Sequence, residues 1–377
     1  MGRSFTKRVL LFLFAIFLLF LSGCQNAQFE RIRYHSGKEI GTEMKAPLSS
    51  VESIVTYQTN MEQFRFVVGW ESNKEILISE SNGEQDVIFS YNIENGERKD
   101  RFFSDHPIIS AKISPSKKYL LIHTSPLLYE ASIRIYRLDT DELVLEKTFE
   151  SSEIDYEWNR DWEDKILIVT FYADWTFQPY ILHIDEERIE TVELPHPFVY
   201  WFGDHSWILL NWNYDIPSMT APLVVYKKGS TETAFPEKEF YYLDRLGDSY
   251  VAIGVSEKDE KEAEFIFFDK KMQPFFSFYA PHLSTFSGWQ IPYYNYIEET
   301  KEFIMIEPIA YGEADIYKGG FQLVKFNLES GEKSVLLNQI ENTPLNCSPD
   351  GKFCLTGHLF EKMIALKSGD MMEFIQF

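Results

Sequence analysis

The sequence predicts an all-β fold, a β-propeller of four-stranded blades, from three observations. Short apolar runs of Val, Ile, Leu, Phe and Tyr, separated by polar turn-rich stretches, fill positions 64–377, and aromatic residues make up 16% of the chain. This composition is typical of strands. After residue 23 no segment keeps a 3.6-residue apolar period over three turns, so we expect no long helix. The apolar runs also recur at a nearly regular spacing.

The recurring apolar runs give the blade count. They are centred on Ile76, Leu120, Ile166, Ile208, Val251, Ile304 and Cys354. The steps between them are 44, 46, 42, 43, 53 and 50 residues, and four strands with their turns need about 40 to 50. We therefore count seven blades, while the two long steps leave six possible. Neighbouring blades cover both faces of each blade, which explains why the runs are nearly continuous.

The second and the last repeats show their strands most clearly. In the second repeat we expect strands at 108–113, 119–123, 132–138 and 143–149. In the last repeat we expect strands at 353–356, 362–366 and 372–377. Two segments compete to complete the last blade and close the ring, namely 51–57 and 372–377.

The amino terminus predicts export and lipid anchoring. Arg3, Lys7 and Arg8 precede 13 uninterrupted apolar residues at 9–21, fewer than the roughly 20 needed to span a bilayer. The run ends in Leu21-Ser22-Gly23-Cys24, which resembles the lipobox of bacterial lipoproteins. The resemblance implies that Cys24 receives a diacylglyceryl group and becomes the first residue after cleavage. Two acyl chains hold a protein on a membrane where one binds only marginally.

These features divide the chain into three parts. We expect a signal peptide at 1–23, the lipidated Cys24 with a flexible polar tether at 24–50, and the propeller at 51–377. The last part is longer than a single compact core usually grows, which fits a repeat architecture. The expected location is the cell membrane, with the domain held by lipid on its extracytoplasmic face.

The charge of the chain excludes one class of partner. The formal net charge is −22, and removal of the three basic residues of the signal makes it −25. Binding to nucleic acid requires a basic face, so we expect no nucleic-acid partner. An acidic balance also disfavours lying flat on anionic lipid headgroups. Its simplest role is to keep an exported protein soluble.

Two cysteines remain in the mature domain, Cys347 and Cys354. A type I turn at Pro349 with Gly351 as a bulge sets Cys347 opposite Phe353 and turns Cys354 to the other face. A two-residue Asp-Gly turn would instead set the two cysteines opposite one another. We favour free, buried thiols, and the oxidising exterior leaves a disulfide open. No histidine or cysteine cluster accompanies them, so we expect no metal site.

Strand order assigns the connections of a propeller to two faces. Turns between first and second strands are short here, whereas the connections between second and third strands are long at 123–131, 172–179, 211–221 and 307–320. Loops on a rigid scaffold carry function, so we predict a binding surface on this face. Its candidate residues are Tyr129, Tyr172, Trp175, Trp212, Tyr214, Tyr311 and Tyr317. Trp175 and Trp212 could stack on a sugar or aromatic group. The alternative is that these aromatics pack the loops onto the blades.

No catalytic or cofactor motif is present in the sequence. It has no Gly-x-Ser-x-Gly elbow, no His-Glu-x-x-His and no phosphate-binding glycine loop. We therefore favour a non-catalytic binding or scaffold protein, and we expect no cofactor. The partner would be an envelope protein or a wall glycan. Two alternatives remain open: an enzyme acting on an extracellular glycan or peptide, and an assembly platform of an envelope protein complex.

Two turns at the same point of the repeat carry a family resemblance. Ser114-Pro115-Ser116-Lys117 and Ser348-Pro349-Asp350-Gly351-Lys352 resemble the first hairpins of WD40-like and TolB-like blades. The Trp-Asp mark of WD40 blades is missing, so only the fold carries over. Together with the lipobox and the tether, the blades look like the YqgU-like propeller lipoproteins of Gram-positive bacteria. That resemblance implies six blades and transfers no catalytic residues.

Overall fold

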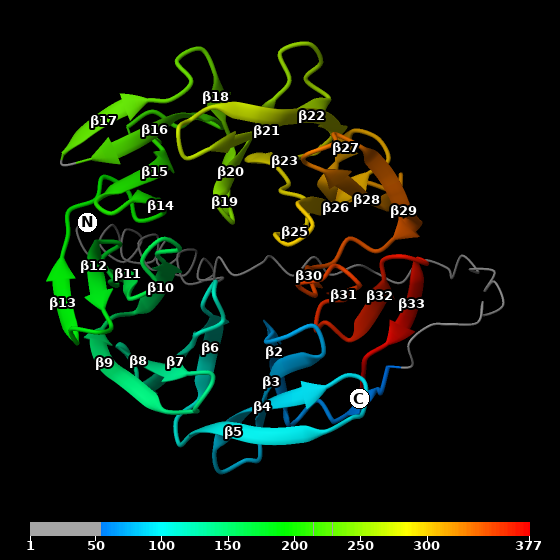
Figure 1. Cartoon of the computed structure of the whole chain (residues 1–377). Helices are drawn as coiled ribbons and strands as arrows, with labels where there is room; N and C mark the ends of the chain where they lie inside the picture. The colour runs from blue at the N-terminus through cyan, green and yellow to red at the C-terminus, as the bar shows by residue number, and fades with distance from the viewer. Residues whose placement is uncertain (1–53, 214, 228) are drawn as a thin grey trace, which may run out of the picture. The chain divides into compact units, whose positions relative to one another are not determined.

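The computed structural model describes residues 54–213, 215–227 and 229–377. Their regular structure is almost entirely β, with one short 3₁₀ turn, η1 (Ala314–Ile316). Seven sheets of consecutive antiparallel strands follow one another around a ring (Figure 1). The predicted all-β propeller fold is confirmed.

The first four blades run from residue 64 to residue 233. Blade one contains β2 (Phe64–Trp70), β3 (Glu75–Ser81), β4 (Asp86–Asn92) and β5 (Arg98–Ser104). Blade two contains β6 (Ile108–Ile113), β7 (Tyr119–Leu127), β8 (Glu130–Arg137) and β9 (Leu143–Glu150). Blade three contains β10 (Glu153–Trp158), β11 (Lys165–Phe171), β12 (Phe177–His183) and β13 (Arg188–Thr191). Blade four contains β14 (Tyr200–Gly203), β15 (Ser206–Leu210), β16 (Ala221–Lys227) and β17 (Ser230–Thr233), and β18 (Glu239–Phe240) pairs with β16 as a fifth strand.

The last three blades complete the ring. Blade five contains β19 (Tyr242–Leu246), β20 (Ser249–Val255), β21 (Glu262–Asp269) and β22 (Pro274–Pro281). Blade six contains β25 (Tyr294–Ile297), β26 (Glu302–Pro308), β28 (Phe321–Asn327) and β29 (Lys333–Ile340). Blade seven contains β30 (Leu345–Cys347), β31 (Phe353–Thr356), β32 (Lys362–Ala365) and β33 (Asp370–Glu373). A small separate sheet contains β23 (Leu283–Thr285), β24 (Gly288–Trp289) and β27 (Gly312–Glu313), and a last one contains β1 (Tyr57–Gln58) and β34 (Ile375–Gln376).

Alternate side chains of a middle strand enter different cores. In β7, Tyr119 and Leu121 pack against blade three, whereas Leu120 and Ile122 pack against blade one. Successive side chains of a strand point to opposite faces, and here both faces meet a neighbouring blade. This is the physical reason for the continuous apolar runs in the sequence.

An apolar cluster fills the boundary between every pair of neighbouring blades. There are seven such clusters for seven sheets, and one of them joins blade seven to blade one through Phe353 and Leu355 against Ile76 and Ile78. The ring is therefore closed by packing. The described residues form seven blades, the number that the spacing of the apolar runs predicts.

The two ends of the described chain meet beside the boundary between blades one and seven. Tyr57 and Gln58 of β1 pair in parallel with Ile375 and Gln376 of β34. The outer strand of blade seven is β33, which contains only residues 372 and 373 of the predicted closing strand 372–377, and the end of that segment forms β34. The alternative that 51–57 adds a strand to the last blade is wrong at Tyr57, because β1 pairs with β34 and not with the outer strand β33. Residues 51–53 lie outside the described part.

The cysteine pair corrects the sequence prediction of free thiols. Cys347 lies directly opposite Cys354 in the β30–β31 hairpin, and a disulfide joins them. The predicted register fails because four residues, and not three, make the turn: Ser348 N–H donates to the Phe353 carbonyl at 2.7 Å. Phe353 N–H donates back to Ser348 Oγ at 3.1 Å. One extra turn residue moves Cys354 to the face of Cys347.

The predicted signal segment 9–21, Cys24 and the tether 24–50 lie outside the described residues. Over the described ranges, no helix has the length and apolar character needed to cross a membrane.

Candidate functional site

Strand direction divides the connections of the ring between two faces. In each antiparallel blade, the connection between second and third strands leaves the same face as the connection to the next blade. We call this the loop face, and the face with the other turns the turn face. Two pairings confirm the assignment: β23, between blades five and six, pairs with β27, inside the second connection of blade six, and β18 pairs with the start of β16.

Exposed apolar side chains gather on the loop face. They are Met61, Leu127, Leu128, Tyr129, Trp175, Phe198, Ile216, Met219, Phe286, Ile309, Tyr311 and Ile316. On the loops of the turn face, the described residues include two exposed large apolar side chains, Trp162 and Val55, the second beside the turn after Ile93. Large apolar side chains exposed on the loops of a rigid scaffold are candidates for an interaction surface. The two faces of the ring therefore differ in the chemistry they present.

Three of the predicted site residues are exposed on the loop face. Tyr129, Trp175 and Tyr311 lie there, and the side chain of Trp175 is 91% exposed. Tyr129 and Trp175 have φ angles of 66° and 67° at hairpin tips. That left-handed conformation costs a non-glycine residue roughly 1 to 2 kcal/mol. The loop at 123–131 is shorter than predicted, since β7 and β8 extend until only two residues separate them.

The other described candidates are half-buried, as the packing alternative predicts. Trp212 packs on the apolar cluster between blades four and five. The Tyr317 hydroxyl accepts a hydrogen bond from Ala310 N–H at 3.1 Å and donates to the Gly320 carbonyl at 3.0 Å. Tyr172 lies beside Thr170, with their hydroxyls 3.3 Å apart. Tyr214 lies outside the described residues. No ring contact joins any two of the six described candidates.

A second feature, a group of polar side chains that sequence analysis missed, surrounds the axis of the ring. The first strands of the blades lie innermost (Figure 1), and hydrogen bonds join neighbouring ones. Ser110 of β6 and Tyr156 of β10 are 2.9 Å apart, and Lys112 donates to Glu157 at 3.1 Å. The hydroxyls of Tyr242 of β19 and Tyr294 of β25 are 2.8 Å apart. We call these residues, with Tyr200 and Asp244, the axial cluster.

The carboxylate of Asp244 is a perturbed group of the axial cluster. Burial raises the pKa of Asp244 to about 6, although hydrogen bonds from Tyr294 and Tyr200 favour the charged form. The nearby charge of Glu157 adds to the rise. Burial also raises the pKa of Tyr294 well above the usual range of a phenol. Perturbed groups of this kind collect at functional sites and also in structural networks.

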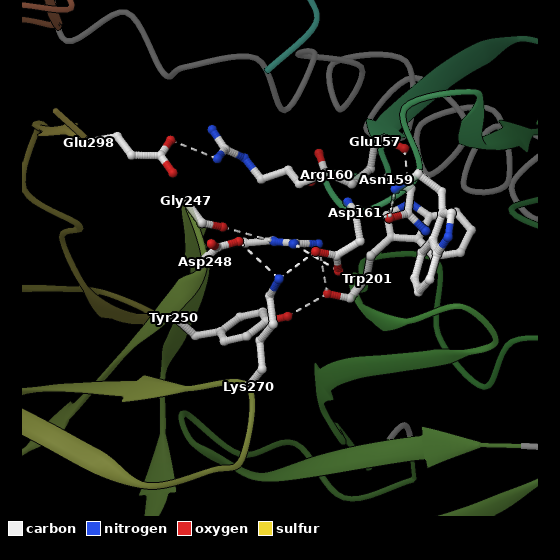
Figure 2. A network of polar contacts seen from close by, with 12 residues as sticks. Glu157, Asn159, Arg160, Asp161, Trp201, Gly247, Asp248, Tyr250, Lys270 and Glu298 are labelled. Atoms are coloured by element: carbon white, nitrogen blue, oxygen red, sulfur yellow. Dashed lines mark hydrogen bonds and ion pairs between the residues drawn. The ribbon is translucent and has the colours of Figure 1, made fainter. Parts of the chain in front are cut away.

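Charged side chains tie blades three to six together on the turn face (Figure 2). The buried Arg245 guanidinium donates to the Trp201 carbonyl at 3.1 Å and pairs with Asp161 at 3.4 Å. Lys270 bonds the same Asp161 and lies 2.9 Å from Asp248. A further ion pair, Arg160 with Glu298 at 2.9 Å, joins blade three to blade six. This network gives the turn face a structural role.

The signal for the axial cluster was present in the sequence. Tyr242-Leu243-Asp244 alternates polar and apolar side chains at the start of a blade. Such alternation indicates a strand with one face in water. The described residues hold no group of three or more His, Cys, Asp or Glu side chains placed to bind a metal ion.

Comparison with known proteins places these features in a family. Residues 92–357 match the family described as a YqgU-like 6-bladed beta propeller domain. The matched segment spans blades two to six and parts of blades one and seven. The chain is 24% identical, over 98% of its length and 97% of the relative, to the "Uncharacterized lipoprotein YqgU" of Bacillus subtilis strain 168.

Solved structures show the same fold. The uncharacterized protein lmo1340 of Listeria monocytogenes EGD-e superposes with a TM-score of 0.78 at 22% identity, over 86% of this chain and 98% of that one. The propeller domain of the Trilobed protease of Pyrococcus furiosus, described as having an open velcro topology, gives a TM-score of 0.51 at 15% identity over 86% and 98%. Both similarities concern the fold alone. The family description gives six blades where this structure has seven, and the match over most of the sequence means that the chain belongs to the YqgU-like β-propeller family.

Proposed function

We propose that this chain is a lipid-anchored binding protein whose propeller holds an envelope protein on its loop face, outside the membrane, without catalysing a reaction. The observation that carries the proposal is the asymmetry between the faces. Exposed apolar side chains lie on loops of blades two, three, four and six on the loop face, whereas the described loops of the turn face carry two, Val55 and Trp162.

The chemistry of the loop face favours a protein partner. Four exposed side chains of this face are aliphatic, those of Leu128, Ile216, Met219 and Ile316. Their transfer from water to another apolar surface is favourable. Aromatic residues and Met are enriched in protein interfaces. A wall glycan would be recognised by flat aromatic rings beside polar groups, and Trp175 is the best-placed ring for that role.

The proposed anchor is Cys24, with the signal peptide at 1–23, the tether at 24–50 and the propeller from residue 51. The similarity to a lipoprotein along nearly the whole chain supports it. A tether of about 26 residues between Cys24 and Ser50 would reach roughly 25 to 30 Å as a flexible coil. That reach would let the propeller turn its loop face toward a neighbouring protein.

Site-specific crosslinking in living cells tests the binding face. A photo-reactive amino acid at Leu128 or Trp175 should give a discrete crosslinked species with one envelope protein. The matched control is Trp162, an exposed tryptophan of the turn face, which should give none. Adding Phe286→Asp, a charge on the loop face, should abolish the species. Crosslinks of equal yield from both faces, or none from the loop face, would contradict the proposal.

A further inference from the structure

The outer strand of blade five, β22, differs in chemistry from the outer strands of the other blades. The seven outer strands are all described, and β22 alone has no charged residue, whereas each of the other six has at least one. Two large apolar side chains of β22 are exposed, Phe275 at 49% and Tyr279 at 39%, and no other outer strand has more than one. β22 therefore presents an uncharged, aromatic edge at the rim of the ring (Figure 1).

The edge of β22 is long enough to pair with a further strand. The strand has eight residues, and in the described part of the chain it pairs with β21 alone. Its register with β21 is regular from Phe276 to Pro281, and a bulge lies at Phe275. Natural proteins protect such edges with charges, short strands or covering segments, because an exposed edge pairs readily with another chain. The missing charge therefore indicates that the edge of β22 is used for pairing.

A groove of about 390 Å³ lies beside this edge, on the side of blade four. It exists because β17, the outer strand of blade four, has only four residues. After β17 the chain turns inward, and Phe235 packs on Phe240 and Phe268. The apolar lining of the groove includes Phe235, Ile266 and Phe275. Its volume is at the low end of the range for ligand pockets, so the groove has room for an aromatic side chain.

The groove offers no net charge to an occupant. Its two charged side chains, Lys238 and Glu264, pair with one another at 2.6 Å. The Tyr279 hydroxyl donates to the other oxygen of Glu264 at 2.9 Å. The formal net charge of the whole chain is −22, so two copies repel one another over most of their surfaces. At β22 the edge and the groove are both neutral, and the segment that complements them is itself uncharged and apolar.

We propose that the occupant is a second copy of this chain, which pairs with β22 through its own β22, antiparallel and about a two-fold axis. β22 is an uncharged, aromatic strand and so meets the requirement that it sets, and a two-fold contact uses the same patch on both copies. Residues opposite one another in an antiparallel pair share a face. With the axis at Ser277 or Phe278, Tyr279 of the second copy therefore lies at the mouth of the groove. The contact is at the rim and leaves the loop face free, so it does not depend on the partner proposed above.

Thiol crosslinking in intact cells tests the proposal. In cells that make the full chain with Ser277→Cys, a short bismaleimide should join two copies, because Ser277 lies at the axis or next to it. Cys347 and Cys354 form a disulfide and do not compete for the reagent. The matched control is Ser230→Cys, at an exposed serine of the outer strand of blade four, which should give no dimer. Equal dimer yields from the two variants, or a Ser277→Cys product with a different protein, would overturn the proposal.

Charge exchange at the same position separates self-pairing from chance proximity. Ser277→Glu or Ser277→Lys alone should lower the co-capture of two differently tagged copies from detergent extracts about tenfold, because like charges meet across the paired edge. Mixing the two variants should restore co-capture, since each copy then meets the opposite charge. Ser277 is exposed, so both variants should unfold at the same temperature as the native chain. Undiminished co-capture of either variant with itself, or no recovery in the mixture, would contradict a two-fold contact at β22.

Discussion

The hydroxyl of Tyr294, on the inner strand of blade six, donates a hydrogen bond to the carboxylate of Asp244 on the inner strand of blade five. Because the hydroxyl proton of Tyr294 is donated to Asp244, the Tyr294 oxygen accepts the hydrogen bond from the Tyr242 hydroxyl, with the two oxygens 2.8 Å apart. Two blades are thus joined at the axis by polar groups, while their apolar side chains pack farther out. The charge state of Asp244 therefore bears on the stability of the ring.

Asp244→Asn should stabilise the protein at neutral pH. The folded-state pKa of Asp244, about 6, lies above its ordinary value of 3.8, so the folded protein binds the proton more tightly than the unfolded chain does. The stabilisation from this group is complete below about pH 4 and is lost as the pH rises through about 6. The free energy of unfolding of the variant should exceed that of the native protein by on the order of 2 to 3 kcal/mol at pH 7, and the two should be equal near pH 4.

Urea unfolding of the variant and the native protein over that pH range measures this difference. Asp139→Asn is the control, because a hydrogen bond from Arg137 lowers the pKa of Asp139. The ionised Asp139 carboxylate stabilises the folded protein, and this stabilisation is lost as the pH falls. A difference for Asp244→Asn that grows toward low pH would refute a buried, proton-binding Asp244.

Phe374→Ala should weaken the closure of the ring. Phe374 is fully buried beside blades one and seven, where Tyr57 N–H donates to its carbonyl at 2.8 Å. Truncating a buried phenylalanine costs about 3 to 5 kcal/mol. Phe377→Ala, three residues on and half-exposed with a ring contact to Phe64, should cost less than about 1 kcal/mol. Equal losses in guanidinium unfolding would mean that the junction is not closed through Phe374.

The sequence predicted strand positions better than it predicted register and orientation. Strands 108–113 and 353–356 have the expected bounds, because an apolar run between turn residues marks a buried strand wherever it packs. The pairing of Cys347 with Cys354 was missed because a single extra residue in a turn reverses which face a side chain takes. The axial position of Asp244 depends on which strand of a blade lies innermost, and only the assembled ring decides that.

The candidate site was predicted in part for the same reason. The loop that carries Trp175 was placed on the correct face, because the alternation of strand directions fixes the face of every loop. Whether an aromatic side chain of a loop is exposed depends on its packing, which the spacing of residues in the sequence does not predict. Trp175 is exposed to solvent, whereas Trp212 packs on the cluster between blades four and five.

Cys24→Ala should abolish lipid attachment. The thiol of Cys24 is the only acceptor that the lipobox-like sequence offers, and an alanine cannot form the thioether. Labelling cells with a radioactive fatty acid should mark the native chain and leave the variant unmarked. The neighbouring change Gln25→Ala keeps the thiol and serves as the control. Label on the Cys24→Ala chain would place the anchor elsewhere.

Trp175→Gly should separate binding from stability. The Trp175 ring is exposed and its φ is 67°, a conformation that glycine adopts without strain. The free energy of unfolding should therefore stay the same or rise by up to about 1 kcal/mol, while crosslinking of the loop face to its partner is lost.

Trp212→Ala should behave differently, because its half-buried ring packs on the cluster between blades four and five. That variant should lose about 1.5 to 3 kcal/mol, roughly half the cost of truncating a fully buried tryptophan. Thermal unfolding recorded beside the crosslinking yield distinguishes the two roles, and a destabilised Trp175→Gly that still captures the partner would remove Trp175 from the binding face.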